Sequence, residues 1–305
     1  MNGLPILVTG GAGLLGLHWA AACREGHPVT RTLHQRNLPL DGTSAVLLDL
    51  SDPDALDRAL GAARVGCVVH TAGLTSVERC EQDPGAAEHH NVKIAACVAA
   101  AAERAGAAMI HISTDHLFDG KAEAYDEDSP VSPINVYGAT KARAEEAVLR
   151  AHPRALVLRT NFYGWGPRHR PSFSDWVLDA LRQDRSLRLF TDIRYTPIHI
   201  SALIEIGMRL WATGQSGIFH AVGDDVLSKY AFGVHLAKAF GLPTNRIEAA
   251  RLADETELVR RPLSMALSNS RLHKALGQSP GSLSNQLSLL RHQETTPAIT
   301  EIRNL

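Results

Sequence analysis

Tyr137 and Lys141 are four residues apart in the segment SPINVYGATKARAEE, residues 132–146, which has the pattern of a helix start. Residues at positions i and i+4 of a helix lie on the same face, so the phenol and the ammonium would be neighbours. A neighbouring ammonium favours the phenolate and lowers the pKa of a tyrosine, whose reference value is about 10. Such a pair could act as a general acid/base. A solvated polar helix face has the same spacing, and this motif alone favours that simpler interpretation.

Hydroxyl groups that could polarise a substrate carbonyl come shortly before this segment. The apolar run AMIHIS, residues 108–113, has the length of a buried strand and leads into Ser113 and Thr114. Ligands of doubly wound sheets bind at the carboxyl ends of the strands, where these hydroxyls are expected. The alternative is that the hydroxyls only cap their own loop. A hydroxyl at this edge, beside a tyrosine–lysine pair, favours carbonyl chemistry.

A glycine-rich turn joins the first predicted strand to the first predicted helix. The segment ILVTGGAGLLGLHWAA, residues 6–21, places glycines where a tight turn and a close backbone approach are needed. The free amide groups and positive dipole end of the following helix suit a pyrophosphate. We therefore predict a dinucleotide site, with a purely structural turn as the alternative. The residues expected to bind the cofactor here are Gly10, Gly13, Leu14, Leu15 and Gly16.

The second predicted strand indicates which dinucleotide is bound. NAD sites usually carry an acidic residue about 20 positions after the glycines, where it holds the ribose 2′-hydroxyl. The segment VTRTLHQRN, residues 29–37, has no acidic residue and contains Arg31 and Arg36. Because arginine can pair with a 2′-phosphate, we expect NADP(H) rather than NAD(H). An exposed basic loop is the alternative interpretation.

Asp49 and Leu50 end the third predicted strand and are further candidates for the cofactor site. The Asp49 carboxylate could accept a hydrogen bond from the adenine amino group. It could equally cap the helix that is expected to begin near Pro53, because aspartate is a favoured N-cap residue.

The apolar pattern of the chain predicts a scaffold for these groups. Short runs of strand length alternate with helical segments, and most runs are apolar throughout, which is typical of strands buried in a parallel sheet. This order predicts a doubly wound α/β sheet of the Rossmann type with a smaller C-terminal substrate-binding domain. The predicted strands are residues 5–10, 28–33, 45–50, 67–72, 108–113 and 155–160, and the predicted helices are about 13–25, 53–60, 84–105 and 135–151.

The pattern changes after residue 165, close to a loop rich in Gly, Pro and basic residues. We expect an NADP-binding domain over residues 1–165 and a mainly substrate-binding domain over residues 166–305, interleaved with the sheet. The later predicted helices are about 174–183, 199–213 and 228–241, and short strands are expected near 187–190 and 217–222.

The composition argues against several other classes of protein. Of the 305 residues, 45% are hydrophobic and 21% charged, and the formal net charge is −1, so no nucleic-acid or membrane partner is expected to bind through bulk charge. The longest apolar run, residues 95–102, is too short to span a bilayer, and the N-terminus lacks the pattern of a signal peptide. No H-E-x-x-H motif occurs among the 15 histidines, so no metal site is expected. The cysteines expected to be buried free thiols of a cytoplasmic protein are Cys23, Cys67, Cys80 and Cys97.

Four motifs together resemble a known family. They are TGGAGLLG (residues 9–16), STDHLFDG (113–120), YGATK (137–141) and LRTNFYG (158–164). These segments are similar to the motifs of the extended short-chain dehydrogenases/reductases. Within that group they are most similar to dTDP-4-dehydrorhamnose reductases and related sugar-nucleotide ketoreductases.

The resemblance implies roles for individual residues. Thr114, Tyr137 and Lys141 would form the catalytic triad, and Asn161 would lie near the nicotinamide end of the cofactor or the substrate phosphates. The residues implied to line the cofactor after the fourth strand are Thr71, Ala72 and Gly73. The chain departs from the family at His116, where tyrosine is usual, and at Phe162, where tryptophan is frequent. These departures concern the choice of sugar more than the reaction.

Several side chains could grip a nucleotide diphosphate, since the arginine fork makes bidentate bonds to phosphate. They are Trp165, Arg168, His169, Arg170, Arg194, Arg260 and Arg261. Each of them alone is better explained as a surface charge, and the pattern does not choose among them. The predicted substrate-binding residues are His116, Asn161, Arg168 and Arg194.

Together these features predict NADPH-dependent reduction of a 4-keto-6-deoxy sugar nucleotide. One alternative is a sugar-nucleotide epimerase or dehydratase, although a dehydratase would want an acidic pair where Asp115 and His116 stand. Another is a regulatory subunit that binds NADP without turnover. A homodimer is left open.

Overall fold

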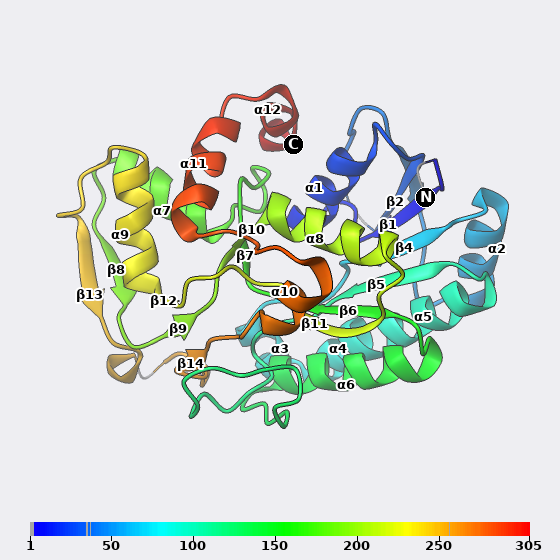
Figure 1. Cartoon of the computed structure of the whole chain (residues 1–305), viewed down its shortest axis with the longest axis horizontal. Coiled ribbons are helices and arrows are strands. Elements are labelled where there is room, and N and C mark those ends of the chain that lie inside the picture. The colour runs from blue at the N-terminus through cyan, green and yellow to red at the C-terminus, as the bar shows by residue number, and fades with distance from the viewer. Residues whose placement is uncertain (1–2, 35, 37, 256) are drawn as a thin grey trace.

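The structure is a computed structural model that describes residues 3–34, 36, 38–255 and 257–305. At its centre lies a parallel sheet with the strand order β11-β6-β5-β4-β1-β2-β3 (Figure 1). Its strands are β1 (Ile6–Thr9), β2 (Val29–Leu33), β3 (Ser44–Leu47), β4 (Cys67–His70), β5 (Ala108–Ile112), β6 (Leu156–Arg159) and β11 (Gly217–His220). The strand order reverses at β1, which lies between β2 and β4, so the ligand-binding switch point follows β1. The predicted doubly wound parallel sheet is confirmed.

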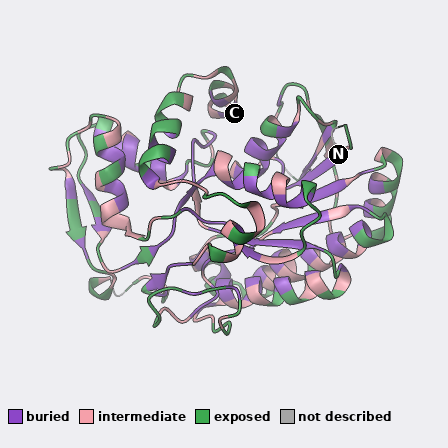
Figure 2. Cartoon of the chain, in the orientation of Figure 1, coloured by how far each residue is buried: buried purple, intermediate pink, exposed green. Residues whose placement is uncertain are grey.

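Helices cover both faces of this sheet (Figure 1). One face carries α1 (Leu14–Cys23) beside α8 (Ile200–Ala212), and the other carries α2 (Pro53–Ala63), α5 (Ile94–Arg104) and α6 (Val136–Ala151). Each layer has its own hydrophobic cluster, and the central strands β1, β4, β5 and β6 between the layers are mostly buried (Figure 2). Buried apolar surface on both faces is the main stabilising contribution to such a sheet.

The third strand differs from its prediction. β3 covers only Ser44–Leu47, and it lies at the edge of the sheet, where it pairs with β2 alone. Leu47 is therefore 76% exposed, although the apolar run around it suggested burial on both faces. An apolar run cannot distinguish an edge strand from a central one, because its neighbours come from elsewhere in the chain.

The helix predicted over residues 84–105 contains a change of helical type. It consists of α4 (Pro84–Glu88), a π-helical turn η1 (His89–Lys93) and α5, in direct succession. π-Helical turns within α-helices are rare and often occur at functional sites. A short helix, α3 (Val77–Gln82), precedes it and was not predicted.

The C-terminal part adds small sheets and helices beside the central sheet, at the left of Figure 1. Of its elements, α8 and β11 return to the central sheet, so the second half of the chain interleaves with the first. The remaining strands are β7 (Phe162–Tyr163), β8 (Leu187–Phe190), β9 (Arg194–Tyr195), β10 (Ile198–His199), β12 (Leu227–Ser228), β13 (Ile247–Ala250) and β14 (Ser264–Met265). The remaining helices are α7 (Phe173–Arg182), α9 (Lys229–Ala239), η2 (Leu252–Asp254), α10 (Ser270–Leu276), α11 (Leu283–Gln293) and α12 (Pro297–Asn304). The last three α-helices were not predicted, and the division at residue 165 stays a prediction.

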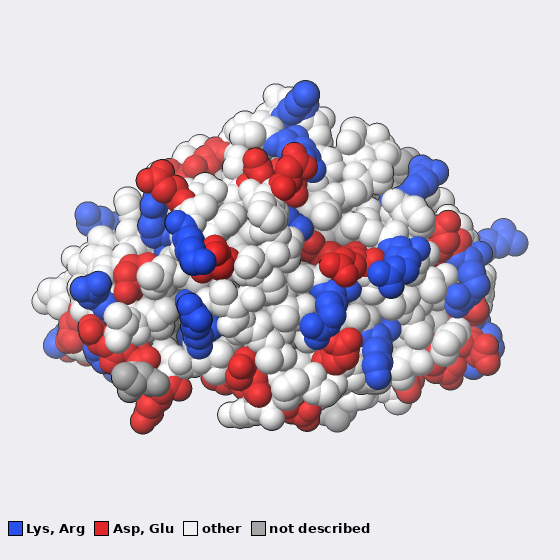
Figure 3. All heavy atoms as spheres, turned by 90° about the horizontal axis from the view of Figure 1, so that it is seen from below, with Lys and Arg blue, Asp and Glu red and all other residues white. Residues whose placement is uncertain are grey.

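The surface charges, the lengths of the helices and the cysteines also bear on the predictions from sequence. Basic and acidic side chains are interspersed over the face shown in Figure 3. In the part of the chain that the structure describes, no helix has both the length and the apolar character needed to cross a membrane. The four cysteines are free thiols, of which Cys97 is only half-buried rather than buried as expected.

Truncation of a core leucine in β6 tests the packing of the central sheet. Leu158 is fully buried, and its side chain lies in the hydrophobic layer shared with α1 and α8. Leu158→Ala should lower the free energy of unfolding by about 2–5 kcal/mol, because it removes buried methyl groups and leaves a cavity. The measurement is urea denaturation followed by circular dichroism.

Leu47→Ala is the matched control, since the same side chain is exposed on β3. It should change the free energy of unfolding by less than about 0.5 kcal/mol. Similar losses for the two variants would contradict the assignment of β3 to an exposed edge and β6 to the core.

Candidate active site

The glycine turn after β1 packs too closely for side chains. Gly10 has φ +69°, and a Cβ on it would lie 2.8 Å from the backbone nitrogen of Ala72. A Cβ on Gly16 would overlap the carbonyl oxygen of Gly10, and one on Gly13 would lie 3.1 Å from the same oxygen. Only backbone therefore lines this turn, as a pyrophosphate requires.

Helix α1 begins directly after this turn. Its N-cap is Gly13, which offers no side-chain cap, and its first turn contains no acidic residue. The first amide groups of α1 are thus left for a ligand, and the helix dipole favours a negative charge there. Leu15 is buried and Leu14 half-buried, so they anchor the helix in the core. The cradle and the free helix end fit a dinucleotide.

Arg31 has a structural role, holding two segments of the chain together, that the sequence did not indicate. Its side chain is buried, and it donates hydrogen bonds to the carbonyl oxygens of Gly11 (3.0 Å) and Leu38 (2.8 Å) and to the hydroxyl of Thr43 (3.0 Å). Burial lowers the pKa of this guanidinium. Arg31 thus ties the glycine turn to the segment before β3. Arg36 is exposed, and its pairing with a 2′-phosphate stays a prediction.

The other predicted cofactor residues follow β3 and β4, and their role in binding stays a prediction. Asp49 accepts hydrogen bonds from the amide and hydroxyl of Ser51, both to Oδ1 (2.8 and 2.7 Å), whereas Asp52 is the residue that caps α2. Leu50 is half-buried against the cluster formed with α2 and α5. The Thr71 hydroxyl donates to the carbonyl of Thr9 (2.7 Å), which fixes the segment after β4 against β1. The cap alternative for Asp49 is therefore wrong.

Asn91, in the π-helical turn, is a residue that sequence reasoning missed. Its Oδ1 accepts from the amide of Leu74 (2.7 Å), and its Nδ2 donates to the Leu74 carbonyl (3.1 Å) and to the Thr140 hydroxyl (3.0 Å). A Cβ on Gly73 would lie 3.0 Å from Asn91 Oδ1. Asn91 thus joins the predicted cofactor segment after β4 to α6. The only hint in the sequence was polar residues within an otherwise apolar helix.

Helix α6 carries the tyrosine–lysine pair on a buried face. Its N-cap Asn135 accepts from the amide of Gly138 (2.8 Å) and donates to the carbonyl of Arg260 (3.0 Å). A Cβ on Gly138 would overlap the carbonyl oxygen of His116, so α6 lies directly against the loop after β5. Tyr137 and Lys141 are only 8% and 7% exposed. The interpretation as a solvated polar face is therefore wrong.

The structure brings Thr114 and Tyr137 together. Thr114 is buried at the carboxyl end of β5, and its hydroxyl is near enough to Tyr137 to act on the pKa of the phenol, in the lowering direction. Burial outweighs this effect and raises the pKa of Tyr137 to about 12. The prediction that the neighbouring Lys141 lowers the pKa of Tyr137 is wrong for the protein by itself, because desolvation of the phenolate is the dominant contribution.

Lys141 points into the sheet. Its Nζ donates to the carbonyl of Ile112 (2.7 Å) and lies 3.4 Å from Nε2 of His111. Burial lowers the pKa of Lys141 to about 8, although the Glu145 carboxylate acts in the opposite direction. The His111 ring stacks on His70 of the neighbouring strand, with ring centroids 5.4 Å apart.

A buried ion pair joins α6, the helix that carries Tyr137 and Lys141, to β6. Arg159, at the end of β6, donates through Nη2 to Glu145 Oε2 of α6 (2.7 Å) and through Nε to both carboxylate oxygens (3.0 and 3.1 Å). The hydroxyl of Ser113 donates to Glu145 Oε1 (2.5 Å). Both charged side chains are nearly inaccessible. Sequence analysis missed them, because each is an ordinary surface residue type.

The predicted substrate residues divide into two groups. Asn161 donates through Nδ2 to Asp115 Oδ2 (2.6 Å), and the His116 ring meets the Tyr137 ring edge-on at 5.4 Å. These side chains lie with the triad. Arg168 and Arg194 are both exposed, and Arg168 lines a separate cavity together with two acidic residues of α7 and the C-cap residue of α11, Glu294.

Other side chains of the loop after β7, and not Arg168, lie close to the predicted site. The positive charge of Arg170 acts on the pKa of Tyr137, and its Nη2 donates to the Thr75 hydroxyl (2.6 Å). His169 Nε2 lies 3.2 Å from the carbonyl of Ala12 in the glycine turn. Trp165 is buried and donates to the Leu290 carbonyl (2.9 Å), whereas Arg261 pairs with Glu78. Arg170 is therefore near enough to Tyr137 for its charge to act on the pKa of the phenol, although its side chain is exposed.

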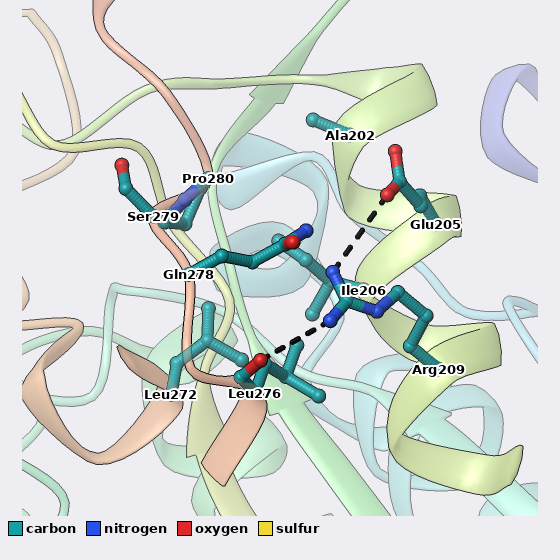
Figure 4. A pocket seen from close by; sticks show the side chains of 9 residues that line it. All are labelled: Ala202, Glu205, Ile206, Arg209, Leu272, Leu276, Gln278, Ser279 and Pro280. Carbon is teal, nitrogen blue, oxygen red and sulfur yellow. Dashed lines mark hydrogen bonds and ion pairs between the residues drawn. The ribbon is translucent and has the colours of Figure 1, made fainter. Parts of the chain in front are cut away.

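A small hollow elsewhere on the molecule is shown in Figure 4. All its lining residues come from α8, α10 and the loop after α10. Arg209 crosses it, donating to the carbonyl of Leu276 (3.2 Å) with Glu205 3.8 Å away, so its role is to satisfy the end of α10. Within the described ranges, no group of three or more His, Cys, Asp or Glu side chains could hold a metal ion.

The reversed strand order, the glycine turn at the switch point and the Thr114–Tyr137–Lys141 cluster define an extended short-chain dehydrogenase/reductase. A family model described as the RmlD substrate binding domain matches residues 4–294. The chain therefore belongs to this family.

Individual relatives agree with this assignment. The probable low-salt glycan biosynthesis reductase Agl14 of Haloferax volcanii is 31% identical over 289 residues, covering 93% of this chain and 96% of its own. The dTDP-4-dehydrorhamnose reductase of Aggregatibacter actinomycetemcomitans is 27% identical, with 94% and 98% covered. A crystal structure of the Bacillus anthracis dTDP-4-dehydrorhamnose reductase in complex with NADP has the same fold, with a TM-score of 0.86 at 21% identity, covering 95% of this chain and 99% of that one.

Gly16→Ala should weaken NADPH binding by about 10-fold or more, a loss of roughly 1.4 kcal/mol. The added methyl group would overlap the Gly10 carbonyl and force the turn away from α1. Titration of tryptophan fluorescence with NADPH measures the dissociation constant. Gly26→Ala is the control, because a Cβ at Gly26 meets nothing within 4 Å. Unchanged affinity in Gly16→Ala would contradict the cradle.

Lys141→Met should raise the free energy of unfolding at pH 7, by on the order of 1–3 kcal/mol. Burial lowers the pKa of Lys141 from 10.5 to about 8, so between these values the folded state binds fewer protons than the unfolded state. The destabilisation by the buried charge is complete below pH 8 and is relieved as the pH rises toward 10.5.

Urea denaturation at pH 7 and pH 10 measures the effect, and the advantage of Lys141→Met should shrink at the higher pH. Lys238→Met, at an exposed position of α9, is the control and should change little. A variant less stable than the unmodified protein at pH 7 would show that the hydrogen bond to Ile112 outweighs the burial of the charge.

Proposed function

We propose that the protein is an NADPH-dependent reductase of a 4-keto-6-deoxy sugar nucleotide, similar to dTDP-4-dehydrorhamnose reductase. The observation that carries this proposal is the buried Thr114–Tyr137 pair at the carboxyl edge of the sheet. The glycine turn also follows the carboxyl end of a strand, and a doubly wound sheet binds its ligands at this edge. The names of the relatives supply the substrate class.

In the proposed reaction each side chain has its own task. The reduced dinucleotide supplies a hydride to the keto carbon when it is bound. Tyr137, whose pKa is about 12, is protonated at neutral pH and gives its proton to the carbonyl oxygen as negative charge develops. Thr114 donates a hydrogen bond to the same oxygen and stabilises that charge. Tyr137 then regains a proton from solvent, so the ketone gains one hydride and one proton.

Lys141 and the groups beneath it hold this arrangement. The Lys141 ammonium has three donors: one is used by the carbonyl of Ile112, a second lies near His111 Nε2, and the third would bind a ribose hydroxyl of the cofactor. Asn161 and Arg170 offer donors on the substrate side. A diphosphate would gain charge-assisted hydrogen bonds there, which are roughly twice as strong as neutral ones.

The alternatives have less support. A dehydratase would need an acidic pair at positions 115 and 116, but His116 is an imidazole, and burial lowers its pKa. A binding subunit without turnover would not need a desolvated phenol beside a hydroxyl. Free thiols at all four cysteines support the cytoplasm as the compartment, because reducing conditions keep them so. A homodimer stays a prediction.

Tyr137→Phe should lower kcat by on the order of 10²–10⁴-fold, because the proton donor is removed. NADPH binding should stay within about twofold, since the ring and its packing are kept. The assay follows NADPH oxidation with a panel of 4-keto sugar nucleotides, and the fluorescence titration measures NADPH affinity. Tyr125→Phe is the control, because its hydroxyl bonds to Asp119 in the loop after β5.

Two results would contradict the proposal. Near-normal kcat in Tyr137→Phe would show that another group supplies the proton. Tight NADPH binding by the unmodified protein, with no turnover of any 4-keto sugar nucleotide, would support the binding-subunit alternative instead.

A further inference from the structure

His111 is a buried histidine of β5 whose ring reaches the catalytic lysine. Its Nε2 is 3.4 Å from Nζ of Lys141, and the same ammonium donates to the carbonyl of Ile112, the next residue of the chain (2.7 Å). Of the side chains that the structure describes, His111 alone lies within hydrogen-bond distance of Lys141 Nζ. The Glu145 carboxylate, one turn further along α6, is occupied by the ion pair with Arg159.

The ammonium determines the protonation state of the ring that faces it. An ammonium only donates hydrogen bonds, so Nε2 of His111 carries a lone pair and the ring proton is on Nδ1. Burial lowers the pKa of His111 well below its usual value, and the positive charge of Lys141 adds to this effect. The ring is therefore neutral at pH 7 and able to accept from Lys141.

A row of side chains across three strands holds this ring in place. Thr9, His70 and His111 are paired positions of the parallel strands β1, β4 and β5. The two rings stack with their centroids 5.4 Å apart and their planes 17° apart, and Nδ1 of His70 lies 2.8 Å from the Thr9 hydroxyl. Thr9 directly precedes Gly10, so the row ties the lysine to the glycine turn.

The other nitrogens of the two rings have no partner. Within the described ranges of the chain, no protein group bonds to Nδ1 of His111 or to Nε2 of His70, although both atoms are buried. An unsatisfied buried polar atom destabilises the folded state, so apolar side chains would suit the core better at these positions. Packing alone therefore does not account for His111, whereas the need for an acceptor beside Lys141 does.

Two acceptors on one side of the ammonium determine where its last donor points. The three N–H bonds are arranged tetrahedrally about Nζ, so fixing two of them leaves one direction for the third. Both acceptors, the Ile112 carbonyl and His111 Nε2, belong to the end of β5. The third N–H of Lys141 is thus directed away from that strand end. With the carbonyl alone, the ammonium could swing about a single hydrogen bond.

We propose that His111 is a positioning residue of the reductase, whose Nε2 holds the Lys141 ammonium so that its third donor is directed at a ribose hydroxyl of the cofactor. This inference rests on the proposed function, in which Lys141 binds that ribose. His111 acts through Lys141 and not by contact with the cofactor or the substrate.

Two amide substitutions separate the two nitrogens of the ring. The amide of glutamine reaches the place of Nε2, whereas the shorter asparagine reaches only the place of Nδ1. His111→Asn should weaken NADPH binding by about 3–10-fold and lower kcat by about 10-fold or more, because a displaced ribose also moves the nicotinamide. His111→Gln should recover most of both losses. Fluorescence titration measures the affinity, and NADPH oxidation with the panel of 4-keto sugar nucleotides measures kcat.

Two controls show whether the loss is specific to the lysine. Adenosine 2′,5′-bisphosphate has the adenine end of NADPH but no nicotinamide ribose, so it should bind to all variants alike. His152→Asn removes another buried imidazole between the same helix and strand, because His152 caps the far end of α6 and its Nε2 lies 2.9 Å from the carbonyl of Ala107, directly before β5. This variant should bind NADPH like the unmodified protein.

The nitrogen-15 spectrum of the unmodified protein gives a test that does not depend on the stability of any variant at high temperature or in denaturant. The ring signals of His111, assigned by their loss in His111→Gln, should show a protonated Nδ1 and an unprotonated Nε2 at pH 7. A proton on Nε2 would overturn the inference, since that nitrogen could not then accept from Lys141.

Several other results would overturn the positioning role. They are equal losses in His111→Asn and His111→Gln, no loss in His111→Asn, an equal loss in His152→Asn, and weaker binding of adenosine 2′,5′-bisphosphate by His111→Asn. Each of these leaves the proposed function intact. If the unmodified protein bound NADPH tightly but turned over no 4-keto sugar nucleotide, the proposed function would fail, and the NADPH affinities would still decide the role of His111.

Discussion

The buried ion pair between Glu145 and Arg159 is the interaction on which the catalytic arrangement depends. Arg159 ends β6, Glu145 lies one turn beyond Lys141 on α6, and Ser113, which bonds to the same carboxylate, directly precedes Thr114. One carboxylate therefore fixes the relative positions of the two strands and the helix that carry the reacting groups. Charges in such a dry place are costly unless each is fully paired, and removing one partner commonly costs about 3–5 kcal/mol. Because neither charge can lose its partner without a large loss of stability, the ion pair holds the two strands and the helix in fixed relative positions.

Features that depend on neighbours in the sequence were predictable. The strands, the glycine turn and the start of α6 each follow from residues within a few positions of one another, as does the placement of Thr114 at a strand end. Tyr137 and Lys141 are related by a single helical turn, so spacing alone puts them on one face. Their burial was not determined by that spacing, because it comes from the loop after β5 pressing on Gly138.

Features that depend on distant partners were not predictable. Arg31 has the residue type of a phosphate ligand, but its guanidinium is used by backbone carbonyls of two other segments. Asn91 joins the loop after β4 to helix α6, and its partners Leu74 and Thr140 are far apart in the chain. Residue type predicts which bonds a side chain can make, whereas the tertiary fold decides which partner it finds.

The interleaving of the two halves has a consequence for how the chain is made. β6 is covered on its outer side by β11, which comes after the whole of α7 and α8. On the ribosome, the edge of β6 stays unpaired until residues 217–220 have emerged. An open strand edge is a template for pairing with other chains, so the nascent protein passes through a stage that is prone to association and suited to chaperone binding. A truncated product ending near residue 165 would keep that edge exposed permanently, even with its nucleotide-binding turn intact.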